Sequence, residues 1–191
     1  MVVLSRITTQ GGDEGMTHLG DMTRVPKADP LIEAIGAVAE ANAAIGLARA
    51  HDLGERVDGW AQTLQQQLFD LGADLATPLP SPETEGRPVP RISSSTVAEW
   101  EEITELLASE LGPLRSFVLP GGPPAAAYLH FATTVVRRAE RAAWRAAAER
   151  GIDQPGGLAR LALIYLNRIS DVLFQMARSA AAQPPELWHH Q

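Results

Sequence analysis

The sequence contains no cysteine in 191 residues, which excludes disulfide bonds and thiolate metal sites. Aromatic residues are also scarce, at 5% of the chain, although 45% of the residues are hydrophobic. The apolar content therefore comes mainly from small and aliphatic side chains, with alanine and leucine prominent. Because both are strong helix formers, the composition indicates closely packed helices in one domain of ordinary size.

An excess of positive charge is missing too, because the formal net charge is -7 at pH 7. This balance argues against a general nucleic-acid binder, which presents a basic surface. No apolar run approaches the roughly 20 residues of a membrane span. The N-terminal residues are too polar for a signal peptide. We expect a soluble, cytoplasmic protein that binds neither membranes nor nucleic acids.

Helical spacing of apolar residues predicts five helices. The first begins with Asp29 as its N-cap and Pro30 in its first turn, and the second covers residues 57–76. A capping box of Thr96 and Glu99 predicts a third helix up to residue 111. The fourth extends from the prolines at 123 and 124 to residue 150, and the fifth covers residues 158–181. The predicted fold is an all-α, five-helix up-and-down bundle over residues 29–182. A glycine-rich segment (1–28) precedes it and a tail (183–191) follows.

Polar residues interrupt the apolar stripes of two helices. Asn42 lies on the buried stripe of the first helix, where its amide needs a partner; it either fixes the packing register or faces a ligand. On the fifth helix we expect an internal salt bridge between Arg168 and Asp171, which are one turn apart. The adjacent His189 and His190 in the tail are weak evidence for a metal site.

The fourth helix carries a dense cluster of charge, with Arg137, Arg138, Glu140 and Arg141 close together. Arginine keeps its charge and offers a planar fork of donors. The cluster therefore either forms a salt-bridged, solvated face, which is the common case, or holds an anion. The residues alone leave both alternatives open.

Glycines are concentrated near the N-terminus, at positions 11, 12, 15 and 20. The spacing matches neither the phosphate loop ending in Gly-Lys-Ser/Thr nor the dinucleotide fingerprint. Such a segment can still wrap phosphates by aiming successive N–H groups at them, or it is a mobile tail.

Four segments, taken in order, resemble the PduO-type ATP:cob(I)alamin adenosyltransferases. The first is RITT at 6–9 followed by GDEG at 12–15, and the second includes Lys27, Asp29 and Asn42. The third, between residues 117 and 141, contains FVLPGG, LH and RRAER in that order. The fourth is YLNRISD at 165–171. The resemblance covers most of the chain. It implies a five-helix bundle assembled as a homotrimer, with active sites at the subunit interfaces.

The resemblance also implies a reaction and its participants. The cobalt of cob(I)alamin attacks C5′ of ATP, giving adenosylcobalamin and triphosphate, with Mg2+ carried on the phosphates and no metal site on the protein itself. A flavoprotein reductase and a cobalamin-dependent acceptor enzyme are the expected protein partners. The expected catalytic residues are Arg138, Glu140 and Arg141. The expected ATP-binding residues are Thr9, Gly12, Asp13, Gly15, Lys27 and Asn167, and the expected corrinoid-binding residues are Phe117, Val118, Leu119 and Arg137.

Several positions depart from the family pattern: Gly11, Met16, Ala39 and Thr133 replace polar or charged residues, and Thr8 and Ile35 replace aromatic ones. The aspartate expected at Ala39 would pair across subunits with Arg137, so Arg137 needs Glu40, water or a ligand anion instead. These departures support an alternative hypothesis. A diverged paralogue would keep the fold, and with it corrinoid or other ligand binding, but would have lost or changed adenosyl transfer. It would act as a carrier, a regulator or a repurposed enzyme.

Overall fold

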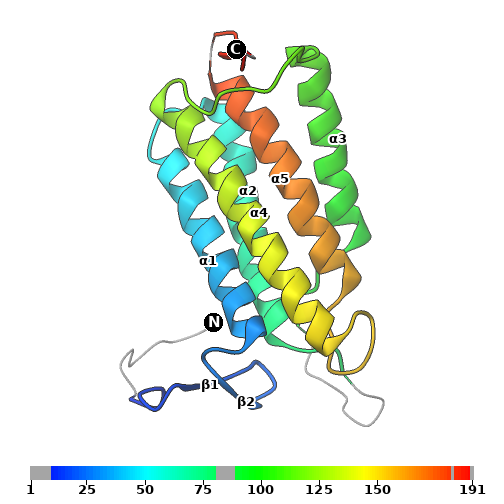
Figure 1. The fold of residues 1–191 in the computed structure, drawn as a ribbon. Helices are drawn as coiled ribbons and strands as arrows, with labels where there is room; N and C mark the ends of the chain where they lie inside the picture. Colours follow the sequence, from blue (N-terminus) through cyan, green and yellow to red (C-terminus); the bar gives the residue numbers. More distant parts are fainter. Residues whose placement is uncertain (1–9, 81–88, 182, 190–191) are drawn as a thin grey trace.

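A computed structural model describes residues 10–80, 89–181 and 183–189. Within these residues five helices run alternately up and down as one bundle: α1 Pro30–Arg49, α2 Glu55–Ala76, α3 Ser94–Leu111, α4 Pro124–Arg150 and α5 Arg160–Ala180 (Figure 1). A short antiparallel hairpin, β1 Met16–His18 with β2 Arg24–Pro26, lies at the end of the bundle where α1 begins. The predicted all-α bundle of five helices is confirmed, whereas the hairpin was not predicted.

Local side-chain capping explains where two of the helices, α1 and α3, begin. The Asp29 carboxylate accepts a hydrogen bond from the Leu31 N–H at 2.8 Å, so the predicted start of α1 is confirmed. The start of α3 was predicted too late. Ser93, not Thr96, is the N-cap, and its hydroxyl accepts the Thr96 N–H at 3.1 Å. The proposed capping box is therefore wrong, because a serine three residues earlier already satisfies the first turn.

Alanine packs α1 against α4. Small buried residues line the two facing surfaces, which explains why so apolar a chain has few aromatic residues. Short side chains let two helix backbones approach closely along their whole length. They are Ala34, Ala37, Ala41, Ala44 and Ala48 on α1, and Ala132, Ala139, Ala142, Ala143 and Ala146 on α4.

Larger side chains fill the centre, where α5 packs against α2, α3 and α4. Leu64, Leu68 and Leu166 are fully buried there. A buried polar junction joins three helices, because the Trp100 indole N–H and the Tyr165 hydroxyl both donate to the Gln67 side-chain oxygen, at 2.6 and 2.9 Å. This shared acceptor satisfies both aromatic donors without water.

Two of the polar residues singled out in the sequence have partners on neighbouring helices. Asn42 donates to the Gln65 carbonyl at 3.0 Å, and Gln65 donates back to the Asn42 side chain at 3.0 Å. Asn42 therefore fixes the packing of α1 on α2. Arg168 pairs with Glu101 of α3 rather than with Asp171, so the predicted salt bridge within α5 is wrong. A partner on another helix cannot be read from spacing along one helix.

The helix α1 is more apolar than the sequence analysis expected. Its mean hydropathy reaches 1.5 over 18 residues, so by length and composition alone it could cross a membrane. Half of that stretch is buried inside the bundle, as in the core helix of a globular protein. The other side of α1 exposes Gly36, Ala39, Ala43 and Leu47 together with two glutamates, Glu33 and Glu40.

Candidate functional site

The hairpin brings the glycine-rich loop next to Lys27. Because Met16 pairs with Pro26, the residues before β1 and after β2 are neighbours. The Lys27 N–H donates to the Gly15 carbonyl at 2.8 Å. A Cβ added at Gly12 would lie 2.9 Å from Lys27 Nζ, so the ammonium group lies against the bare backbone of Gly12. The hairpin thus places a cation over a turn of exposed peptide groups.

The turn preceding the hairpin depends on glycine. Gly15 has φ +76°, a conformation that residues with a Cβ rarely adopt. The N–H groups of Asp13 and Gly15 donate to the carbonyls of Gln10 and Gly12, both at 3.2 Å. Asp13 itself is exposed. Four of the expected ATP-binding residues, Gly12, Asp13, Gly15 and Lys27, therefore lie together, and Thr9 lies outside the described residues.

The charged cluster of α4 divides by direction. Arg137 and Arg141 are one turn apart and exposed, on the side of α4 away from the core. One Nη of Arg141 donates to the Arg137 carbonyl at 3.1 Å, which holds the Arg141 side chain along the helix. Within the part of the chain that the structure describes, neither guanidinium forms an ion pair. This pair, the arginine face, is available to an anion.

Arg138 differs from its two neighbours because it is neutralised within the chain. It projects toward α1 and forms an ion pair with Glu40, with both side chains about half exposed. Glu40 was one of the partners considered for Arg137, and within one chain it is taken by Arg138 instead. Arg137 is left facing solvent.

Glu140 faces the opposite way, toward α5, and belongs to a chain of polar contacts. The Asn167 amide donates to the Glu140 carboxylate at 3.3 Å and accepts from Arg168 at 2.8 Å. Arg168 in turn pairs with Glu101 of α3. This network fixes the orientation of Glu140 beside the arginine face. Asn167 retains one free N–H and one free lone pair for a further contact.

The two halves of the expected nucleotide site are not joined within one chain. The hairpin lies near the C-terminal end of α4, where Arg150 pairs with Asp29 at 2.7 Å. Arg141 lies about 13 Å further along the α4 axis. Among the described residues, no hydrogen bond or ion pair connects residues 10–28 to the arginine face.

The expected corrinoid segment lies at the other end of the bundle, in the loop that leads into α4 (Figure 1). Phe117 is 80% exposed and Leu119 40%, so apolar surface faces outward. Val118 is half-buried. The C-terminal tail holds this loop in an antiparallel bridge: the Leu119 N–H donates to the Glu186 carbonyl at 2.9 Å, and the Trp188 N–H donates to the Phe117 carbonyl at 2.8 Å.

Sequence reasoning missed this role of the tail, which it treated only as a weak metal candidate. The Trp188 ring meets the Phe117 ring edge-on, with centroids 6.4 Å apart. An apolar Leu187-Trp188 pair in an otherwise polar terminus was the available signal. Among the described residues, no group of three or more histidine or acidic side chains could hold a metal ion.

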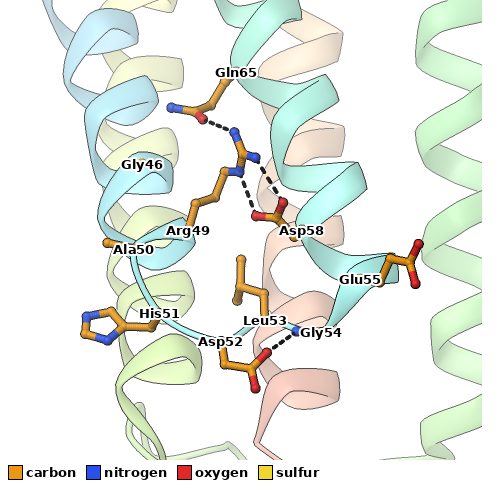
Figure 2. A pocket seen from close by; sticks show the side chains of 10 residues that line it. All are labelled: Gly46, Arg49, Ala50, His51, Asp52, Leu53, Gly54, Glu55, Asp58 and Gln65. Carbon is orange, nitrogen blue, oxygen red and sulfur yellow. Dashed lines mark hydrogen bonds and ion pairs between the residues drawn. The ribbon is translucent and has the colours of Figure 1, made fainter.

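A concave region at the turn between α1 and α2 contains an internal ion pair. It has a volume of about 590 Å³ and contains Arg49, Asp58 and Gln65 (Figure 2). Arg49 donates to both Asp58 oxygens, at 2.8 and 3.0 Å, and to Gln65 at 3.0 Å. The carboxylate and the guanidinium therefore neutralise one another. The pairing lowers the pKa of Asp58 through the hydrogen bond from Arg49.

Comparison with known proteins identifies the family. The profile described as cobalamin adenosyltransferase matches residues 7–180. The chain belongs to this family. The corrinoid adenosyltransferase of Mycobacterium tuberculosis H37Rv is 45% identical over 98% of this chain and 94% of that protein. The human corrinoid adenosyltransferase MMAB is 33% identical over 93% of this chain and 70% of that protein.

Solved structures agree with the sequence comparison. A variant of the PduO-type ATP:corrinoid adenosyltransferase of Lactobacillus reuteri, complexed with cobalamin and ATP, aligns with a TM-score of 0.85 and 29% identity. The alignment covers 97% of this chain and 100% of that one. The resemblance drawn from the sequence motifs is therefore confirmed over nearly the whole cobalamin adenosyltransferase fold.

Proposed function

We propose that this protein is an ATP:corrinoid adenosyltransferase that transfers the 5′-deoxyadenosyl group of ATP to cob(I)alamin. In this reaction a cobalt–carbon bond forms at C5′, the C5′–oxygen bond breaks, and triphosphate leaves with the bonding electrons. The observation that carries the proposal is the arginine face of Arg137 and Arg141, which has no carboxylate partner among the described residues and lies beside the oriented Glu140. Family membership supports the same reaction.

The chain's own residues would act mainly by binding and by electrostatics. A leaving triphosphate gains negative charge, and fixed positive charge near it lowers the barrier without reorganisation. Arg141 and Lys27 supply that charge, and the backbone N–H groups of Gly12 and Glu14, which take no part in the hydrogen bonds of the turn described above, donate to phosphate oxygens. Arg138 contributes less, because Glu40 already neutralises it. Glu140 and Asn167 orient the nucleotide, and Phe117, Val118 and Leu119 shield the corrinoid face from water.

Homotrimer formation is part of the proposal, because the two halves of the site are separated within one chain. The exposed side of α1 and α4 supports an interface there. It includes small and apolar residues, Gly36, Ala39, Ala43 and Leu47 on α1 and Tyr128 and Phe131 on α4, alongside exposed charges such as Glu40 and Arg137. An apolar surface of this kind is typical of subunit contacts. A neighbouring subunit could then bring its Lys27 loop to the arginine face of this one.

Magnesium fits the site as an ion bound to the phosphates of the nucleotide. Mg2+ commonly keeps several waters and uses one or two carboxylates with the phosphates of its ligand. Asp13 is an exposed carboxylate in the loop that would receive those phosphates. Bound there, the ion would neutralise phosphate charge. A cytoplasmic location, a flavoprotein reductase that generates cob(I)alamin, and a cobalamin-dependent acceptor enzyme complete the proposal.

The departures from the family pattern do not favour a loss of function. Thr133 is buried, and its hydroxyl donates to the Leu129 carbonyl at 2.9 Å, so it serves as a core residue of α4. Met16 lies in β1 and pairs with Pro26. Ala39 is exposed and removes a charge without disturbing the Arg138–Glu40 pair. These three substitutions leave the arginine face and the Lys27 loop intact, and Thr8 lies outside the described residues.

An anaerobic assay tests the proposal directly. Cob(I)alamin and Mg-ATP are supplied to the purified protein, and adenosylcobalamin formation is followed by absorbance. We expect product in proportion to enzyme, with triphosphate released in equal amount. Absence of product at high enzyme concentration would refute the proposed activity, and calorimetry with ATP and with cob(II)alamin would then show which half of the site still binds.

A further inference from the structure

An exposed tryptophan of α4, Trp144, lies beside the arginine face. It follows Arg137 by seven residues and Arg141 by three, and its side chain is 45% exposed. Residues at these spacings share one side of a helix. A single apolar side chain on a protein surface is common and needs no explanation by itself. The surroundings of Trp144 therefore decide what the ring can do.

Trp144 differs from the other three tryptophans in having no partner. Among the residues that the structure describes, no aromatic ring or guanidinium lies against the Trp144 ring, and its indole N–H forms no hydrogen bond. The ring is therefore free to stack with a group from outside the chain. The partners of the other tryptophans are Arg56 for Trp60, Gln67 for Trp100 and Phe117 for Trp188.

The position of Trp144 around α4 places it between two groups that are proposed to contact the nucleotide. At 3.6 residues per turn, Trp144 lies about 60° from Arg141 and about 40° from Glu140, on opposite sides. Glu140 faces α5, where Asn167 donates to its carboxylate. Arg138, whose ion pair lies toward α1, is about 120° away. Trp144 therefore lies on the side of the arginine face toward α5, away from the proposed subunit interface at α1.

The Arg141 side chain leaves the Trp144 ring uncovered. One Nη of Arg141 donates to the Arg137 carbonyl at 3.1 Å, so the guanidinium extends toward the N-terminal end of α4. Trp144 lies on the other side of Arg141, about 4.5 Å further along the helix axis. Positive charge and an aromatic surface thus follow one another along one side of the helix. A nucleotide has the same order of parts, with anionic phosphates at one end and a flat aromatic base at the other.

We propose that Trp144 binds the adenine base of ATP by stacking while Arg141 holds the phosphates. The identity of the ligand rests on the function proposed above. Stacking uses only the flat face of a base, so it supplies affinity without requiring a particular pattern of hydrogen bonds. Trp144 is then a nucleotide-binding residue that fixes the base. By fixing the base it also limits where the ribose can lie relative to the arginine face.

The test compares a ligand that has a base with one that lacks it. Calorimetry gives the dissociation constants of Mg-ATP and of inorganic triphosphate. For Trp144→Ala we expect ATP binding to weaken about tenfold, as for one lost base stack, and triphosphate binding to be unchanged. Trp144→Phe keeps an aromatic ring, so its ATP affinity should stay within about threefold of the wild type. Arg141→Ala should weaken the binding of both ligands.

Tryptophan fluorescence gives a second measurement that does not depend on turnover. ATP should quench the emission of the wild type, because the base lies against an exposed indole, and triphosphate should not. Most of this change should be lost in Trp144→Phe, since the other three tryptophans lie away from the arginine face. Phe69→Ala is the matched control: Phe69 is a 74% exposed aromatic residue of α2, and its loss should alter neither ATP affinity nor quenching.

The outcomes separate the two proposals. If the wild type binds no ATP, both the proposed function and the stacking role are wrong. If the wild type forms adenosylcobalamin and Trp144→Ala binds ATP as tightly as the wild type does, only the stacking role is wrong. Analytical ultracentrifugation of each variant covers the remaining case. A smaller assembly in Trp144→Ala, with ATP and triphosphate weakened equally, would overturn the stacking role, because Trp144 would then be a subunit contact.

Discussion

Arginine has opposite roles at two places along this bundle. At the α1–α2 turn, Arg49 donates to both oxygens of Asp58 and to Gln65, so its charge is neutralised within the chain (Figure 2). On α4, Arg137 and Arg141 face outward without a carboxylate partner in the described chain. The residue type is identical in both places. The difference is whether the fold places a carboxylate beside the arginine, as at Arg49, or leaves the guanidinium free to bind an anionic ligand.

The largest effect should follow from removing Arg141. We expect Arg141→Ala to lower turnover about 100-fold or more, because one preorganised donor to developing charge contributes that much. Folding should be almost unaffected, since the side chain is exposed and its one hydrogen bond, to the Arg137 carbonyl, lies at the surface. Steady-state kinetics under anaerobic conditions and a melting curve test this. Arg145→Ala, another exposed arginine of α4, is the control, and equal losses in both variants would contradict the assignment.

A smaller effect is expected from the glycine loop. Lys27→Ala should raise the KM for ATP about tenfold while leaving the corrinoid KM unchanged, since a charged contact to phosphate is lost. Gly12→Ala should act in the same direction, because its Cβ would displace the Lys27 ammonium. Gly59→Ala, where an added Cβ meets nothing within 4 Å, should leave both KM values unchanged. An unaltered ATP KM in Lys27→Ala would exclude this loop from phosphate binding.

Ala39→Asp should give Arg137 of the arginine face a carboxylate partner, as Arg49 has in Asp58 at the α1–α2 turn. In the proposed homotrimer, a carboxylate at this exposed position of α1 would pair with Arg137 of a neighbouring subunit, since Glu40 already pairs with Arg138. We expect corrinoid binding to tighten about threefold, within the range of an exposed ion pair. The gain should vanish in the double variant with Arg137→Ala. A gain that survives the loss of Arg137 would mean that the new carboxylate acts elsewhere.

The smallest effect is expected from breaking the Arg49–Asp58 ion pair. Asp58→Asn should reduce the free energy of unfolding at neutral pH by at most about 1 kcal/mol, because the pair is partly exposed. The pKa of Asp58 is lowered in the folded state, so its contribution is present above about pH 4 and is lost as the pH falls through the folded-state value. Urea unfolding at pH 3 and pH 7 should therefore show a larger difference between wild type and variant at pH 7 than at pH 3. Turnover should not change.

Much of the fold could be predicted because its signals are local. Asp29 followed by Pro30 starts α1, and a glycine after Arg150 ends α4, so those limits needed only neighbouring residues. The hairpin was missed because its strands have three residues each, too few to show an alternating pattern. The family motifs likewise brought together Gly12, Asp13, Gly15 and Lys27 before the structure placed them around one turn.

Contacts between distant residues were harder to predict. Arg168 was assigned to Asp171 on its own helix, but it pairs with Glu101 of α3. The tail was treated as a terminus, but its backbone pairs with the loop at Phe117. In each case several partners were chemically equivalent, and only packing selects among them.

By itself the sequence determined the helices, the apolar faces and the residue types that could bind a nucleotide and a corrinoid, because periodicity and charge are properties of neighbouring residues. The tertiary structure alone decided which charges remain free. In the folded chain Arg138 pairs with Glu40, Arg168 with Glu101 and Arg49 with Asp58. Arg137 and Arg141 stay exposed. An ion pair depends on distance in space, and the spacing of residues along the chain does not set that distance across a bundle.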